Sequence, residues 1–186
     1  MAMKVYDLVV KSKKDACYAY MPDAILSSPN KRSLYRFLYS EDSCNWPDWI
    51  SSFYFYAQEG LTDVELTHLD YLEVLGPYAL FSENFFKVFH ELLQTEVIFH
   101  PIQVIAHRGE GKAYNFYLAK FLRSEKFLRA NENGKAMIEL YSKFTPFLLA
   151  KDVAPEYAYC YFASESMVNI CKENNMQIAF KEAKFR

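Results

Sequence analysis

Short runs of β-branched and aromatic residues recur along the chain and are separated by turn-forming residues, a pattern typical of strands. The predicted strands cover residues 3–11, 51–58, 96–106, 113–122, 157–162 and 176–183. Within residues 51–58, Phe53 and Phe55 alternate with Tyr54 and Tyr56, so the two pairs are expected on opposite faces. Periodicity also leaves open a helix over residues 115–128. Residues 60–70 are predicted to form a connecting loop.

Apolar residues at helical spacing predict three helices. In the first, Ser33 is expected to cap a short helix that ends near Tyr39. The second and third start at Ser82-Glu83 and Ser164-Glu165, where serine caps the helix and glutamate favours the positive end of the helix dipole. Each is followed by another predicted strand. The repeated order indicates an internal duplication of a strand-helix-strand unit, although Ser-Glu is also a common cap that can arise twice independently.

Strands mixed with few helices predict an α+β fold with a mixed or antiparallel sheet. A chain of 186 residues is long enough for one domain with a small additional portion. We expect an acidic and aromatic N-terminal portion over residues 1–70, packed on a main domain over residues 71–186. The sequence contains no apolar run of membrane-spanning length and no signal-peptide pattern, so a cytoplasmic protein with free cysteine thiols is expected.

Charge is unevenly distributed, although the formal net charge is only −2. Between Arg36 and Lys87 there are nine acidic residues and no Lys or Arg. Aromatic residues make up 18% of the chain, and Tyr and Trp can pack against a core while presenting a polar end to solvent. An acidic, aromatic surface would attract a basic protein. The alternative is that these acids only solvate one part of the globule.

Sequence motifs for catalysis are not found. His90-Glu91 is not followed by the second histidine of a zinc-protease helix, and Gly109-Glu110-Gly111 lacks the rest of a phosphate-binding loop. We therefore expect no catalytic residues, no metal and no cofactor. A small hydrolase stays as an alternative, because catalytic triads depend on geometry and not on sequence order. A second alternative is a nucleic-acid-binding module over residues 112–135, where basic and aromatic residues are interleaved; an amphipathic element with a buried aromatic face explains the same pattern.

A family resemblance begins with the residues before Phe81, the Ser82-Glu83 cap with its helix, and the sequence Phe99-His100-Pro101-Ile102. These motifs resemble a family of immunity proteins from bacterial polymorphic toxin systems, the group called immunity protein family eleven, first catalogued as a domain of unknown function. The strand over residues 114–122 and the strand, helix and strand over residues 161–180 are similar to the family's later elements. The resemblance covers about residues 70–186, and Asn174-Asn175-Met176 departs from it where a glycine turn is expected.

The resemblance implies a non-enzymatic antitoxin that binds a cognate secreted toxin and protects the producing cell. Acidic and aromatic residues with no nearby base are the expected contacts with a basic toxin surface. The candidates are Asp42, Trp46, Asp48, Trp49, Tyr54, Tyr56, Glu59 and Asp63. Core packing is the alternative role for the two tryptophans. No membrane partner is expected, and nucleic acid is a disfavoured partner because the sequence pI is near 6.1.

Overall fold

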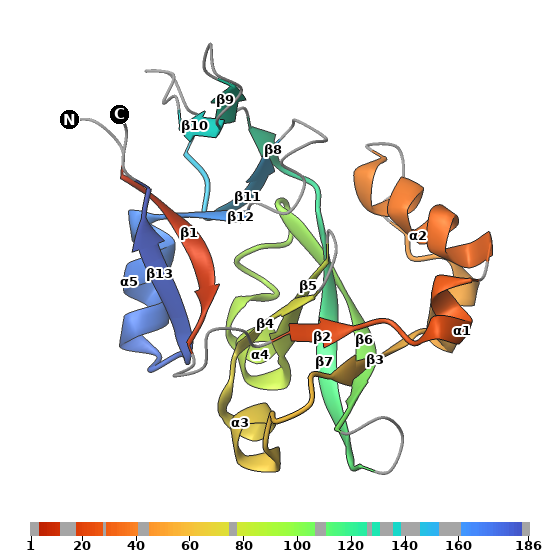
Figure 1. Ribbon diagram of the computed structural model, residues 1–186. Helices are drawn as coiled ribbons and strands as arrows, with labels where there is room; N and C mark the ends of the chain where they lie inside the picture. The colour runs from red at the N-terminus through yellow and green to blue at the C-terminus, as the bar shows by residue number, and fades with distance from the viewer. Residues whose placement is uncertain are drawn as a thin grey trace.

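The computed structural model describes residues 4–11, 18–27, 29–40, 45–74, 78–106, 111–125, 128–130, 136–138, 146–152 and 161–183. These residues form helices and mixed sheets, which confirms the α+β prediction. In Figure 1 a barrel occupies the centre, with a second sheet and α5 on one side and helices α1 and α2 on the other. No helix among the described residues has the length and apolarity needed to cross a membrane.

Six strands close the barrel in the order β2 (Tyr18–Tyr20), β3 (Tyr54–Ala57), β6 (Val97–Ile105), β7 (Ala113–Phe121), β5 (Ala79–Ser82) and β4 (Tyr71–Val74). Pairing is parallel between β2 and β4 and between β3 and β6, and antiparallel at the other junctions. The pairing of β2 with β4 completes the ring, so each barrel strand has a neighbour on both sides. Strand composition predicted β3, β6 and β7, but closure depends on pairings between distant strands.

The second sheet has the order β13 (Ile178–Glu182), β1 (Val5–Val10), β12 (Tyr161–Ser164), β11 (Leu149–Asp152) and β8 (Ser124–Glu125). A separate hairpin joins β9 (Leu128–Ala130) to β10 (Ala136–Ile138). Strand β1 lies between two C-terminal strands, whereas β2 and β3 belong to the barrel. Strands from both sides of residue 70 therefore share both the barrel and the five-stranded sheet.

The two strand-helix-strand units suggested by the sequence have the same topology. Strand β5, helix α4 (Glu83–Phe89) and strand β6 form one unit, and β12, α5 (Glu165–Glu173) and β13 form the other. In each unit a third strand lies between the two strands and runs antiparallel to both: β7 in the barrel and β1 in the sheet. This arrangement is the split β-α-β unit. Ser82 Oγ accepts the N–H of Phe85 at 3.0 Å, and Ser164 Oγ accepts the N–H of Met167 at 3.3 Å, so both serine caps are confirmed.

Several sequence predictions for the helices need correction. Helix α2 (Pro29–Tyr39) starts at proline and not after Ser33, because proline suits the first helical turn. Residues 60–70 contain helix α3 (Asp63–His68), which begins with a capping box between Thr62 and Glu65. The helix considered over residues 115–128 is wrong, since most of that range lies in β7 and β8. The remaining helical elements are α1 (Asp23–Leu26) and the 3-10 helix η1 (Asp48–Ser52).

The described residues form two hydrophobic cores. Inward-facing residues such as Phe55, Leu80 and Phe116 fill the barrel together with apolar residues of α1, α2 and α3. A second core lies between the outer barrel wall and the second sheet, where Phe85 of α4 and Met167 of α5 are both buried. The barrel wall formed by β4, β5 and β7 is thus covered by this core, whereas no residue of β2 or β3 belongs to it.

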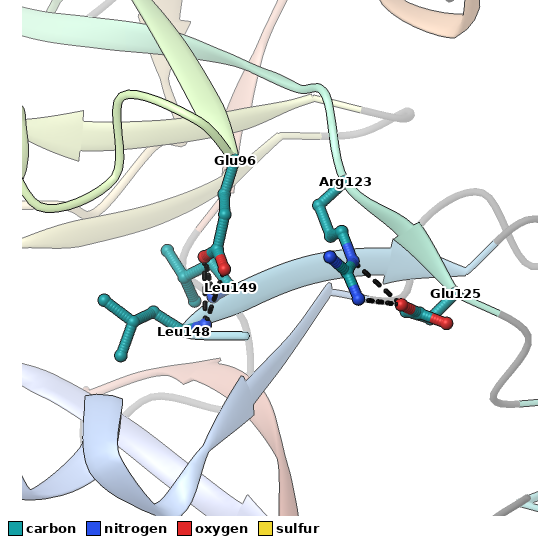
Figure 2. Close-up of polar contacts among 5 residues, drawn as sticks. All are labelled: Glu96, Arg123, Glu125, Leu148 and Leu149. Atoms are coloured by element: carbon teal, nitrogen blue, oxygen red, sulfur yellow. Dashed lines mark hydrogen bonds and ion pairs between the residues drawn. The ribbon is translucent and has the colours of Figure 1, made fainter. Parts of the chain in front are cut away.

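Hydrogen bonds to two carboxylates connect the barrel to the second sheet. One oxygen of Asp70, which is 4% exposed, accepts the backbone N–H of Gln177 at 2.7 Å, and the other accepts the Ser82 hydroxyl. At the other end Glu96 accepts the backbone N–H groups of Leu148 and Leu149 at 2.8–2.9 Å (Figure 2). Hydrogen bonds from backbone N–H groups to carboxylate oxygens are strong, so both contacts fix the position of the second sheet relative to the barrel.

Candidate partner-binding face

The outer wall of β3 carries two adjacent tyrosines. Phe55 and Ala57 are buried toward the barrel interior, so the alternation of the strand turns Tyr54 and Tyr56 outward, where both are half-buried. Their ring centroids lie 5.5 Å apart in an edge-on arrangement. The prediction that Tyr54 and Tyr56 face away from Phe55 is confirmed.

Strand pairing adds a third tyrosine to this wall. Tyr20 of β2 pairs directly with Tyr56, and their ring centroids lie 5.8 Å apart. A hydrogen bond with Tyr54 raises the pKa of Tyr56, and burial and the neighbouring Tyr20 raise it further. We call Tyr20, Tyr54 and Tyr56 the tyrosine face. Tyr20 is not among the contacts predicted from the sequence. Its alternation with Ala19 is a weak strand signal, and it does not reveal that this strand pairs with β3.

The two tryptophans lie at the margin of the barrel core. Trp46 is half-buried between Phe37 of α2 and His100 of β6, with ring centroids 5.0 and 5.2 Å away. Its indole nitrogen is buried and has no hydrogen-bond acceptor among the described residues. Trp49 is also half-buried and packs on Phe53 at 5.5 Å. Both rings therefore have a packing role, whatever contact their exposed edges make.

Three of the predicted acidic contacts are exposed along the segment that contains β3. Asp48 is the first residue of η1, Glu59 lies in the turn after β3, and Asp63 is the first residue of α3. Burial raises the pKa of the Tyr114 hydroxyl, and the nearby Asp63 carboxylate raises it further. Asp42 lies outside the described residues.

Other acids of the same segment have structural partners. The carboxylate of Glu65 closes the capping box on Thr62, Asp70 joins the two sheets, and Glu83 pairs with Lys87 at 2.9 Å. Glu73 of β4 is half-buried, and burial raises its pKa. The acidic surface is thus smaller than the sequence implies, and it is concentrated around β3.

A cleft of about 520 Å³ lies between α3, the start of β7 and the turn before β13. His68, Asp70 and Ser82 all line it, which bears on the hydrolase alternative. The Ser82 hydroxyl contacts Asp70 directly and caps α4, whereas the Nδ1 atom of His68 bonds the Val64 carbonyl at 2.7 Å. A catalytic triad instead places histidine between the serine and the acid. These contacts favour a structural role for the three residues.

Two basic residues in the first part of the segment 112–135, Lys120 and Arg123, have partners within the fold, whereas Lys112 is exposed. Lys120 is 1% exposed, and its ammonium lies 4.1 Å from the centre of the Phe37 ring and 3.3 Å from the Ser40 hydroxyl. Arg123 is paired with Glu125 (Figure 2). Phe116 and Phe121 are buried in the two cores. The burial of Phe116 and Phe121 agrees with the alternative interpretation, but Lys120 is buried as well and does not lie on a polar face.

No protein-family model matches the sequence, and a search of curated proteins found no match. Within the described ranges, no group of three or more His, Cys, Asp or Glu side chains is placed to hold a metal ion. The geometry of the tyrosine face and its flanking carboxylates is accordingly the basis for a functional proposal.

Proposed function

We propose that this protein is an immunity protein, which binds a secreted bacterial toxin and neutralises it by protein-protein contact. The observation that carries the proposal is the tyrosine face on the outer barrel wall, with Asp48, Glu59 and Asp63 exposed along the same segment. The resemblance of residues 70–186 to an immunity-protein family supports the same function. The partner would present a basic surface.

Tyrosines suit such an interface for a physical reason. Each contributes a large, rigid contact area with only two rotatable side-chain bonds, so little conformational entropy is lost on binding. Tyr54 and Tyr56 stand on a strand of a closed barrel, which fixes their spacing before the partner arrives. The Tyr54 and Tyr56 hydroxyl groups are hydrogen-bonded to each other, which further fixes the two rings before binding. We therefore expect them to be the main source of affinity.

The carboxylates are expected to act mainly on the rate and selectivity of association. Asp48, Glu59 and Asp63 are exposed, and salt screens exposed charges over about 8 Å at physiological ionic strength. Complementary charge at the rim of an interface speeds encounter more than it adds affinity. Charge reversal at these three positions should therefore slow association about tenfold at low salt and have a smaller effect at high salt.

The test uses the C-terminal domain of a large secreted protein encoded beside the gene for this chain. We expect that domain to co-purify with the protein, and co-expression to relieve its toxicity. The Asp48→Lys, Glu59→Lys, Asp63→Lys variant should associate more slowly while remaining folded. Its unfolding temperature should fall only slightly, because a lysine at the first residue of α3 opposes the helix dipole. Glu91→Lys is the matched control, since its side chain is 85% exposed and lies beyond α4. A gene neighbourhood without such a protein, or a domain that is neither bound nor neutralised, would overturn the proposal.

A further inference from the structure

Strand β13 forms one edge of the second sheet and pairs only with β1 among the described strands. The Ala183 N–H donates to the Val5 carbonyl at 2.9 Å, which identifies the hydrogen-bonded residues of this antiparallel pair. Bonded and non-bonded pairs alternate, so Ala179 and Lys181 also direct their backbone groups toward β1. Ile178, Phe180 and Glu182 consequently direct their N–H and C=O groups outward, where another strand can pair with them.

The side chains of the same outward-bonding residues face a groove. Phe180 is half-buried and pairs with Leu8, and Ile178 pairs with Val10, which places these residues on the face that packs toward α5. The groove between α5 and these strands has a volume of about 370 Å³. Its apolar lining consists of Tyr6, Val168, Cys171, Met176, Ile178 and Phe180. Figure 1 shows β13 beside α5 at the side of the molecule away from α2.

Charge in the lining of this groove has one sign. Lys11 follows β1 and Lys172 lies in the last turn of α5; both are exposed, and neither has an ion-pair partner in the described part of the chain. The register that pairs Val10 with Ile178 places Lys11 at the end of the groove next to Ile178. A carboxylate on a bound segment would lie near both ammonium groups at this end.

We infer that the groove between β13 and α5 binds an extended acidic-apolar segment of a partner protein, which adds as a strand to the edge of β13. The outward backbone groups of Ile178 and Phe180 supply the ladder of hydrogen bonds, and the groove accepts an apolar side chain. Residues two apart on a strand share a face, so an acidic residue two positions from that apolar residue reaches Lys11 and Lys172. This surface is distinct from the tyrosine face and accepts the opposite charge.

The probes are fluorescein-labelled peptides in which every second residue is threonine. The residues between the threonines are Asp, Val and Val, and these three are meant to face the groove. One control peptide replaces Asp with Lys, and a second carries N-methyl groups on the backbone nitrogens that would pair with β13. Fluorescence anisotropy should give at least tenfold weaker binding for both controls. NMR should show shifts at the amides of Ile178 and Phe180. The double variant Lys11→Glu, Lys172→Glu should reverse the preference between the Asp and Lys peptides, whereas Lys31→Glu on exposed α2 should not.

Phe180→Pro removes an outward N–H without removing a bond to β1, and it should weaken binding at least tenfold. If that variant does not fold, the N-methyl peptide tests the same hydrogen bonds from the ligand side. Equal binding of the Asp and Lys peptides, or no binding of the Asp peptide up to about 1 mM, would overturn the inference. A homodimer that Phe180→Pro dissociates would also overturn it, because the edge would then belong to a second copy of this chain.

Discussion

Removing the buried carboxylate of Asp70 should loosen the junction between the barrel and the second sheet. This side chain is 4% exposed and accepts the Gln177 N–H at 2.7 Å, the Ser82 hydroxyl and, at 3.4 Å, the Asn84 amide. Asp70→Ala leaves the backbone N–H of Gln177 without its acceptor. It also deprives the Ser82 hydroxyl of the oxygen to which it donates at the start of α4.

The size of the loss follows from these contacts. A hydrogen bond to a charged group contributes about 1.5–3 kcal/mol, and the Asn84 contact is too long to add much. Two such bonds therefore predict a loss of about 3–6 kcal/mol for Asp70→Ala. Asp70→Asn can keep its oxygen toward Gln177 and turn its amide toward Ser82, so its loss should be only about 1–2 kcal/mol. For a chain of this size each kcal/mol lowers Tm by about 2–4 °C.

Urea unfolding followed by circular dichroism measures both losses, with thermal unfolding as a second readout. Glu91→Ala is the control, because an exposed side chain should change the free energy of unfolding by less than about 0.5 kcal/mol. The reasoning would be refuted if Asp70→Ala cost no more than this control. It would also be refuted if Asp70→Asn were as damaging as Asp70→Ala, since the loss would then not depend on a retained acceptor.

Three further predictions concern stability and reactivity. Burial raises the pKa of Glu73 above its ordinary 4.5, so its contribution to stability is present at low pH and declines as pH rises through the folded-state pKa. Glu73→Gln should therefore have a larger free energy of unfolding than the wild type at pH 7. That free energy should also change less with pH above 4.5. Thr62→Ala removes the acceptor for the Glu65 N–H and should cost about 1 kcal/mol in urea unfolding, with Thr67→Ala nearer to neutral. Burial, with a smaller effect from Asp70, raises the pKa of Cys171 to about 12. In a variant whose other cysteines are replaced, Cys171 should react with a thiol reagent at pH 8 only as fast as the protein unfolds. Rapid labelling of the native protein would contradict the burial of this thiol.

Local signals predicted several of the individual elements. Ser82 and Ser164 stand directly before glutamate and an apolar helical face, and both act as caps. Alternation in residues 54–57 predicted which side chains face outward. Asn175, just after α5, has a φ of 54°, a left-handed conformation that asparagine tolerates better than most residues. These features depend on neighbours within a few residues, so the sequence alone contains the information.

Features that depend on distant segments were not predicted. Closure of the barrel requires β2 to pair in parallel with β4, across more than 50 residues. Asp70 was counted as one of nine acids, but its role depends on Gln177, which the sequence places far away. Tyr20 becomes a candidate contact only through its pairing with Tyr56. The overlooked start of α3 is different, because Thr62 and Glu65 have the spacing of a capping box in the sequence itself.

The central claim is that the tyrosine face binds the toxin. Isothermal titration calorimetry of the purified toxin domain against the Tyr54→Ala, Tyr56→Ala variant tests it most directly. The two tyrosines together are expected to contribute about 2 kcal/mol or more to binding, so their removal should weaken the affinity by at least about 30-fold. The control is Tyr35→Ala, which removes a tyrosine that is 40% exposed on α2. Wild-type affinity in a folded double variant, or an equal loss in the control, would contradict the account.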